Sequence, residues 1–323
     1  MAKYIFKRIL WMIPIILLVS VLVFTLLYFC PGDPCDLLLP EDATEAQRIA
    51  LRHELGLDQG YFKRLGDFLT NTFIRFDLGT SYINKTDIAS EIAVRLPRTM
   101  LIGFLSMVIG VGIGVPLGIV AALKQNTFFD RGCMAFALFG VSMPSFWLAL
   151  LLILLFSVNL GWLPAYGIGS LSHYILPTLA GCMGGIATQA RQSRSSMLEV
   201  IRSDYVTTAR AKGLSSLRVV LRHELPNALL PIITVAGSQF MVMFGGSLVI
   251  EQVFSIPGMG SLFSASVMNR DYPVVLAGAV FMAIVSSLVI LLIDLLYAAV
   301  DPRIKAQYSG ASAKKAKRGA KAV

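Results

Sequence analysis

The residues whose side chains are best suited to binding a partner lie in a polar, basic loop at 197–232, called the basic loop from this point on. It carries five cationic side chains, at Arg202, Arg210, Lys212, Arg218 and Arg222. Groups of this kind bind carboxylates on a protein or phosphates on a lipid surface. The loop lies between segments apolar enough to enter a bilayer. Its residue chemistry alone leaves both kinds of partner open.

Patterns that carry catalysis or nucleotide binding are missing from the sequence. No Gly-Lys dipeptide occurs, so the phosphate-binding G-x-x-x-x-G-K-[ST] loop is not encoded. The H-E-x-x-H and G-x-S-x-G patterns are also absent. The three histidines fall in separate regions, at His53, His173 and His223. We therefore expect a non-catalytic chain without a cofactor. If ATP drives this protein, another subunit binds the nucleotide.

The four cysteines do not indicate a metal site. They are Cys30, Cys35, Cys133 and Cys182. None forms a C-x-x-C pair, and no histidine lies beside them at metal-ligand spacing. Cys30 and Cys35 could pair on an oxidising side of a membrane, but free thiols are the favoured interpretation.

Composition places the chain in a membrane. Of its 323 residues, 56% are hydrophobic and only 15% are charged, which is too apolar for a soluble domain of this size. The net charge of +9 would suit nucleic acid, but the basic residues fall in short pieces between apolar runs. Membrane topology explains that pattern better, so no nucleic-acid partner is expected.

Six apolar segments predict an all-α polytopic membrane protein with six transmembrane helices. They are 9–29, 100–123, 133–160, 174–190, 229–250 and 273–300. The first is longer than the roughly 7–15 apolar residues of a signal peptide and no cleavage site follows, so we expect it to be retained despite Pro14. The fourth is the weakest, because glycines and Gln189 dilute it.

Two local patterns predict how the spans are shaped. Gly110, Gly114 and Gly118 recur every four residues, which places them on one helix face for close packing. The Ser-Met-Pro-Ser sequence at 142–145 predicts a distortion inside the third segment.

The distribution of Lys and Arg predicts the orientation. With the N-terminus inside, inner segments hold 19 of the 28 basic residues, and eight of the other nine lie in the long 30–98 block. Such blocks count little in the positive-inside rule, so the short loops divide 19 to 1. Both termini are therefore expected in the cytoplasm, where the basic run at 314–321 would meet anionic lipid.

This topology divides the chain into four parts. They are an N-terminal tail with the first helix (1–29), an extracytoplasmic subdomain (30–98), a core of five helices that includes the basic loop (99–303), and a basic cytoplasmic tail (304–323). Within the subdomain, charge patterning predicts a helix at 41–57 and the sequence at 76–81 predicts a turn.

The basic loop itself predicts a two-helix lever. Gly213 suits the left-handed residue that ends a helix, and Ser215 can cap the next one. Pro226 and Pro231 mark the return to the membrane. One face of the first helix is expected to hold Met197, Val200, Ile201, Tyr205 and Thr208. Such a lever suits docking to a partner that moves, whereas an amphipathic loop resting on lipid is the alternative.

A secondary transporter would show charged groups at mid-membrane or two similar halves. No repeat is detected, and Asp294 is the one candidate charge, near the inner end of the last segment. A polar contact between that helix end and a neighbouring helix is the favoured interpretation.

The basic loop resembles the cytoplasmic signature of ABC importer permeases, which reads Glu-Ala-Ala, three residues, Gly, nine residues, Ile, one residue, Leu-Pro. In this chain the register falls on Thr207-Thr208-Ala209, Gly213, His223 and Leu225-Pro226. The first two positions and the Ile position depart from the general pattern. These departures resemble the branch that imports peptides.

Further segments carry the resemblance over nearly the whole chain, outside 41–64 and the basic tail. In the basic loop they are DYV at 204–206, TARAKGL at 208–214, RH at 222–223 and NALLP at 227–231. Elsewhere they are PGDP at 31–34, DLGTS at 77–81, LPRT at 96–99, PSFW at 144–147, LP at 163–164, EQVFSIPGMG at 251–260, DYP at 271–273 and DPR at 301–303. Together they resemble the B-type permease subunit of dipeptide, oligopeptide and nickel ABC importers.

The resemblance implies a type I ABC importer permease fold in the bacterial inner membrane, with an extracytoplasmic insert after the first helix. It implies a second homologous permease, two cytoplasmic ABC ATPase subunits that bind ATP and Mg, and an extracytoplasmic substrate-binding protein. Dipeptides or oligopeptides would be taken up by alternating access. Nickel chelates, glutathione or another small solute are alternatives, and a secondary transporter, a channel or an intramembrane enzyme are less favoured.

The resemblance also implies two sets of site residues, none of them catalytic or metal-binding. A coupling helix would dock on an ATPase through Ser203, Asp204, Tyr205, Thr208, Ala209, Arg210, Lys212 and Gly213. Tyr205 and Ala209 are expected to make buried contact there, whereas Arg210 and Lys212 either pair with acidic ATPase groups or only set the topology. A second set would face the binding protein, close the path from outside or form a simple connecting turn, namely Glu251, Pro257, Gly258 and Asp271.

Overall fold

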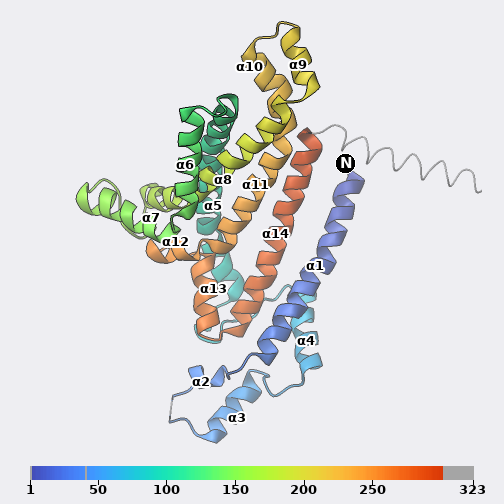
Figure 1. The fold of residues 1–323 in the computed structure, drawn as a ribbon. Coiled ribbons are helices and arrows are strands. Elements are labelled where there is room, and N and C mark those ends of the chain that lie inside the picture. Colours follow the sequence, from blue (N-terminus) through green and yellow to red (C-terminus); the bar gives the residue numbers. More distant parts are fainter. Residues whose placement is uncertain (1, 41, 301–323) are drawn as a thin grey trace, which may run out of the picture. The chain divides into compact units, whose positions relative to one another are not determined.

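The chain folds into helices joined by short connections. The computed structural model describes residues 2–40 and 42–300, whose helices Figure 1 follows along the chain. In these ranges regular structure is helical, apart from a single β-bridge between Thr80 and Asp87. The all-α class predicted from the sequence is therefore confirmed. The basic tail expected at 304–323 and the 301–303 motif lie outside the described residues.

The helices follow one another along the chain, with η marking π-helical or 3-10 turns. They are α1 (Ala2–Phe29), α2 (Cys35–Leu38), α3 (Glu45–Glu54), α4 (Tyr61–Thr70), η1 (Asn71–Arg75), α5 (Ile88–Leu123), α6 (Phe128–Ser142), α7 (Ser145–Leu152), η2 (Ile153–Asn159), η3 (Leu171–Tyr174), α8 (Ile175–Ile201), α9 (Asp204–Ala211), α10 (Ser216–Val219), η4 (Val220–Glu224), α11 (Leu225–Gly246), α12 (Leu248–Val253), α13 (Met259–Met268) and α14 (Tyr272–Val300).

Contacts divide the described residues into two compact units. The first unit consists of 2–8, 101–255 and 288–300, and the second unit consists of 9–40, 42–100 and 256–287. Each unit gathers segments that are far apart in the sequence. The four-part division expected from topology, with an insert at 30–98, stays a prediction.

Within residues 2–40 and 42–300, four helices are long and apolar enough to cross a membrane. They span Ile5–Phe29, Ile88–Leu123, Ser216–Met243 and Tyr272–Tyr297. A fifth span is reached if the bent pair Phe128–Ser142 and Ser145–Asn159 counts as one. The remaining expected span lies in α8, which is 27 residues long but is not among the helices that are apolar enough. The prediction of six spans is thus met only in part.

Two proline positions behave as the sequence predicts. Helix α1 continues through Pro14 without a break. Helix α6 ends at Ser142, and Pro144 takes an extended conformation before α7 begins, so the two helices meet at 98°. A proline has no N–H to donate and disfavours helical backbone in the residue before it, which explains a sharp break at this point.

The first unit is built on close contact between α5 and α8. A Cβ atom added to Gly114 would lie 2.6 Å from the Ile186 carbonyl oxygen, and one added to Gly118 would collide with the Ala190 carbonyl oxygen. Gly110 meets α8 at Gly185 in the same way, at ordinary contact distance. The glycine face predicted from the four-residue spacing is confirmed, and α8 is the helix that packs against it.

Two glutamines tie α8 to α11 in opposite directions. Gln189 is fully buried and donates from Nε2 to the Ile232 carbonyl at 2.9 Å. Gln239 donates from Nε2 to the Gly185 carbonyl at 3.0 Å. Hydrogen bonds of this kind hold helices together in lipid, where apolar contact alone gives little preference. The polarity that weakened the fourth expected span therefore has a structural use.

The second unit has an aromatic cluster and an aliphatic core. Phe24 of α1 packs against Tyr61 and Phe68 of α4 at ring-centroid distances of 5.8 and 5.6 Å. The aliphatic core joins α5, α13 and α14 through Ile88, Ile92, Met259, Val274 and Ala277. The helix expected at 41–57 is α3, which begins with a capping box formed by Thr44 and Gln47.

Candidate functional site

The basic loop leaves α8, forms α9, turns at Gly213 and returns through α10 and η4 into α11. Figure 1 shows α9 and α10 side by side beyond the ends of α8 and α11. The turn works because Gly213 has a φ of +77°, the left-handed conformation that glycine adopts without strain. Its N–H donates to the Arg210 carbonyl at 2.9 Å. The predicted helix end at Gly213 is confirmed.

Local sequence explains where α9 begins and how α10 follows. Ser203 is extended and breaks the helical path after α8, and Asp204 then places a carboxylate in the first turn of α9, where the helix dipole favours it. Ser215 stands directly before α10 in an extended conformation, as expected. Its hydroxyl makes no cap hydrogen bond, so the predicted capping contact is wrong.

The inner face of α9 differs from the sequence-based expectation. Val206 and Ala209 are 0% and 5% exposed and pack with Val219, whereas Tyr205 is 44% exposed and Thr208 is exposed. The predicted face continued the helical period of α8 into α9. The break at Ser203 resets that period, so the buried positions move by one residue.

Most of the predicted coupling residues are nevertheless accessible. Exposed members of the set are Asp204, Tyr205, Thr208, Arg210, Lys212 and Gly213. Ser203 is half-buried. Ala209 packs inside this chain, so its side chain does not face a partner, and Tyr205 is an accessible aromatic side chain of α9.

Arg210 has an internal partner that the sequence did not reveal. Its Nη2 donates to Glu224 Oε1 at 2.8 Å, and Glu224 is fully buried at the end of η4. The bond joins the last turn of α9 to the residue before α11. Glu224 follows His223 of the signature register, and an acid directly before the Leu225-Pro226 pair of that register was the available signal.

A second ion pair braces α8 before it enters the basic loop. Arg194 donates from Nε to Asp130 Oδ1 at 2.6 Å and from Nη2 to Asp130 Oδ2 at 2.7 Å. Asp130 is 3% exposed and also accepts from the Asn126 backbone N–H. This two-pronged contact fixes orientation as well as distance between α6 and α8. Sequence reasoning missed it, because the partners lie 64 residues apart.

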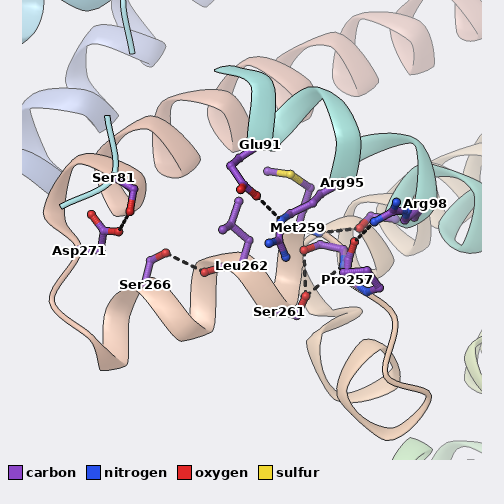
Figure 2. A network of polar contacts seen from close by, with 12 residues as sticks. Ser81, Glu91, Arg95, Arg98, Pro257, Met259, Ser261, Leu262, Ser266 and Asp271 are labelled. Atoms are coloured by element: carbon purple, nitrogen blue, oxygen red, sulfur yellow. Dashed lines mark hydrogen bonds and ion pairs between the residues drawn. The ribbon is translucent and has the colours of Figure 1, made fainter. Parts of the chain in front are cut away.

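In the second unit, Asp271 links two motifs that are 190 residues apart. Figure 2 shows its carboxylate facing Ser81. Ser81 Oγ donates to Asp271 Oδ2 at 2.5 Å, and the Tyr82 backbone N–H donates to Oδ1 at 2.9 Å. Both Ser81 and Asp271 are buried. The turn predicted at 76–81 is thereby held to the start of α14.

Figure 2 also shows Arg98, in the N-terminal third of α5, beside Pro257 and the start of α13. Arg98 donates to the Pro257 carbonyl at 3.0 Å. The Met259 N–H donates to Thr99 Oγ1 at 2.8 Å, and Thr99 is fully buried. Two neighbouring residues of the 96–99 motif, Arg98 and Thr99, therefore bind two closely spaced residues of the 251–260 motif.

The second predicted site set is largely internal, and its expected role in binding-protein contact or outer gating stays a prediction. Glu251 belongs to the first unit, is fully buried and accepts a hydrogen bond from Ser247 Oγ at 2.7 Å. Gly258 and Asp271 are buried in the second unit, and Pro257 is half-buried there. These residues shape the segment from within, because their polar groups are already bound. Accessible side chains nearby are Val267 and Met268 of α13.

The structure agrees with two further interpretations of the sequence, on Asp294 and on the cysteines. Arg8 Nη2 donates to Asp294 Oδ1 at 2.9 Å, which is the expected contact between the end of α14 and a neighbouring helix. The cysteines at 30, 35, 133 and 182 are free thiols. Within the described ranges, no three His, Cys, Asp or Glu side chains gather as metal ligands would.

Comparison with protein families covers nearly the whole chain. The family described as binding-protein-dependent transport system inner membrane component matches residues 114–306. A companion model, described as the N-terminal part of such membrane components, matches residues 1–103.

Two relatives show how close the likeness is. The glutathione transport system permease protein GsiC of Escherichia coli O6:H1 is 44% identical over 306 residues, covering 94% of this chain and 99% of the relative. A Brucella abortus protein, provisionally named as a peptide transport system permease, is 41% identical over 313 residues with the same coverage.

Solved structures show the same fold at lower identity. The inward-facing MetNI methionine ABC transporter matches with a TM-score of 0.56 and 20% identity, covering 66% of this chain and 97% of that one. An amino acid ABC transporter solved with histidines gives a TM-score of 0.52 and 17% identity, covering 65% and 94%. The chain belongs to the family of binding-protein-dependent transport system inner membrane components, as an ABC importer permease of the peptide and nickel type that crosses the bacterial inner membrane several times.

Proposed function

We propose that this chain is the B-type permease subunit of an ABC importer that takes up short peptides. The names of its relatives support the substrate class, since glutathione is itself a peptide and the Brucella abortus protein carries the name of a peptide transporter. The importer would contain a second homologous permease, two cytoplasmic ATPases and an extracytoplasmic binding protein. Substrate passes from that protein through the two permeases by alternating access.

The geometry of α9 is the observation that carries this proposal. Its inner face is packed on Val219, and its outer face presents Asp204, Tyr205 and Thr208 to solvent. A short helix linked to α8 at one end and, through the Gly213 turn, α10 and η4, to α11 at the other suits the transfer of movement, because a push on α9 reaches both long helices. In this role α9 is the coupling helix and docks in a cleft on an ATPase.

Orientation follows from charge. In the proposed topology the basic loop and both termini lie in the cytoplasm, as the 19 to 1 division of basic residues in short segments indicates. The bent α6–α7 pair and α8 then complete six spans. Helix α8 tolerates the polar Gln189 because its amide donates to α11, and Gln239 of α11 donates back to an α8 carbonyl.

Helix α13 and its connections form the proposed outer gate. Asp271, Thr99 and Arg98 hold both ends of this segment through the hydrogen bonds described above. A segment held at both ends moves as one piece with α5 and α14. Exposed residues such as Met268 are available for contact with the binding protein.

The permease itself is proposed to be non-catalytic, with ATP and Mg bound by the partner ATPases. The absence of a phosphate-binding loop from the sequence supports this division of labour.

Purification of the tagged chain together with the proteins encoded beside it tests the proposal. We expect the two ATPases and the second permease to be retained in stoichiometric amounts, and the neighbouring binding protein to be stabilised by a short peptide. Glutathione and a nickel chelate are the comparison ligands. Stabilisation by the nickel chelate alone would overturn the peptide assignment, and a chain that purifies without ATPases would overturn the importer.

A further inference from the structure

Glu224 is a carboxylate in an unusual position, because it is fully buried at the junction of a basic loop and a membrane helix. Its Oε1 accepts from Arg210 at 2.8 Å, whereas Oε2 has no hydrogen-bond partner among the described residues. Removing a carboxylate from water is costly unless a counter-charge offsets it. Arg210 therefore supplies the main compensation for Glu224.

The location of the pair gives it a mechanical meaning. Arg210 is in the last turn of α9, and Glu224 is the residue directly before α11. Between them the chain reverses at Gly213, so the ion pair joins the two arms of the basic loop, α9 and η4, opposite the turn. The apolar contact of Val206 and Ala209 with Val219 closes the same gap.

The surroundings of Arg210 show where its side chain points. It borders a groove of about 740 Å³ that lies between α5 and the α10–η4 segment. The other lining residues are nearly all apolar: Pro116, Ile119, Val120, Leu123, Ser216, Leu217, Val220 and Leu221. The guanidinium thus lies toward the membrane helices and Glu224, although 53% of the side chain stays exposed.

We propose that Glu224 is a positioning residue for coupling, which holds Arg210 and thereby fixes the tilt of α9 against α11. This inference rests on the proposed function, since it takes the movement of α9 to come from an ATPase. It assigns Arg210 an internal role, in place of a direct ion pair with an acidic group on the ATPase. Without this Arg210–Glu224 brace, α9 still docks on the ATPase but turns about Gly213 without moving α11.

The test is a double-mutant cycle, in which Glu224→Gln keeps the volume of the buried side chain and Arg210→Gln removes the guanidinium that pairs with it. Glu224→Gln, Arg210→Gln and the double variant are assembled with the partner subunits in proteoliposomes. The readouts are peptide uptake per ATP hydrolysed and capture of the ATPases. Arg218→Gln removes the same charge from an exposed position of the same loop and is the matched control.

We expect both single variants to keep ATPase capture and to lower uptake per ATP at least about fivefold, a typical size for energetic coupling between sites. The double variant should equal the singles, because each change already removes the whole pair. Effects that multiply in the double variant would overturn the inference. So would loss of ATPase capture in Arg210→Gln alone, which would assign Arg210 to the partner.

A second readout separates this inference from the proposed function. Amide hydrogen exchange of the full chain in detergent needs no partner, and we expect Glu224→Gln and Arg210→Gln to speed exchange in 204–211 equally. Unchanged exchange in both variants would refute the brace even if the wild type transports peptide. Wild-type proteoliposomes that lack ATP-dependent uptake would instead refute the proposed function and leave the exchange result to judge the brace.

Discussion

At the scale of single residues, the backbone of Gly213 decides whether the basic loop can reverse. Its φ of +77° lies where a side chain causes strain, but a Cβ atom added there would meet no atom within 4 Å. Backbone conformation and side-chain crowding are therefore separable at this position. Few sites in the loop offer so direct a test of the lever.

Gly213→Ala should weaken coupling through the backbone alone, because a left-handed alanine costs roughly 1–2 kcal/mol. We expect reduced peptide uptake with ATPase capture retained, and Gly213→Pro should be more severe, since proline cannot adopt this φ. The matched control is Gly132→Ala in α6, where an added Cβ also meets nothing within 4 Å and φ is not positive. Normal uptake by Gly213→Pro would contradict the lever.

The two cysteines at 30 and 35 should differ in reactivity toward maleimides. Burial, followed by the neighbouring Asp33 carboxylate, raises the pKa of the Cys35 thiol to about 11, and the side chain is 1% exposed. A raised pKa means less thiolate at pH 8, and the thiolate is the reactive form. Cys30 is exposed and free.

We therefore expect Cys30 to be alkylated rapidly at about pH 8 and Cys35 to react only as the pH approaches its pKa of about 11, measured peptide by peptide with mass spectrometry. Cys30→Ser removes the fast phase and identifies it. Equal rates in mild alkali would show that Cys35 is not buried as described, and a disulfide between the two would abolish both signals.

At the scale of elements, α8 is the helix on which the first unit depends. It packs on the glycine face of α5, is hydrogen-bonded to α11 by two glutamines and is held to α6 by the Asp130–Arg194 pair. It also leads directly into α9. An element fixed on three sides can carry a displacement from one end to the other without bending.

Close approach of α5 and α8 predicts a sharp difference between two glycines of α5. At Gly114 an added Cβ would lie 2.6 Å from a carbonyl oxygen and 2.8 Å from Gln189 Cβ, whereas at Gly112 it would meet nothing within 4 Å. Gly114→Ala should lower the thermal midpoint in detergent and reduce yield, because the helices must separate. Gly112→Ala should leave the midpoint unchanged or raise it. Equal midpoints would mean that α5 and α8 do not pack this closely.

The Asp130–Arg194 pair should matter more than surface ion pairs do. Asp130→Asn leaves Arg194 without its carboxylate partner, and breaking a largely buried pair costs about 3 kcal/mol. We expect a clearly lower unfolding midpoint for Asp130→Asn and a smaller loss for Arg194→Lys, which keeps the charge but not the two-pronged geometry. Asp42→Asn, at an exposed position, is the control. A midpoint matching that control would assign the pair no structural role.

At the scale of the whole molecule, the sequence predicts what depends on local spacing. The glycine face, the break at Pro144, the turn at Gly213 and the family itself follow from patterns within a few residues of each other. The Ser81–Asp271 and Asp130–Arg194 contacts could not be predicted, because they join positions 190 and 64 residues apart. The exposed face of α9 was misplaced because one extended residue, Ser203, resets the helical period.

The same scale explains why composition finds fewer spans than the proposed six-span topology contains. Helix α8 is diluted by glycines that serve close packing and by Gln189, which bonds α11, so its apolar composition falls below that of a helix facing lipid. A permease whose helices pack against one another needs such residues. Apolar composition therefore identifies a lipid-facing helix more readily than one that packs against several other helices, as α8 does.

The central claim is that this chain imports peptide only together with ATPases that act through the basic loop. The most direct measurement is uptake of a labelled short peptide into proteoliposomes that contain this chain, the second permease and the two ATPases. The binding protein is supplied on the extracytoplasmic side and ATP on the ATPase side. We expect uptake to require ATP and the binding protein and to fall in Gly213→Ala. Uptake by this chain alone, driven by an ion gradient without ATP, would contradict the account.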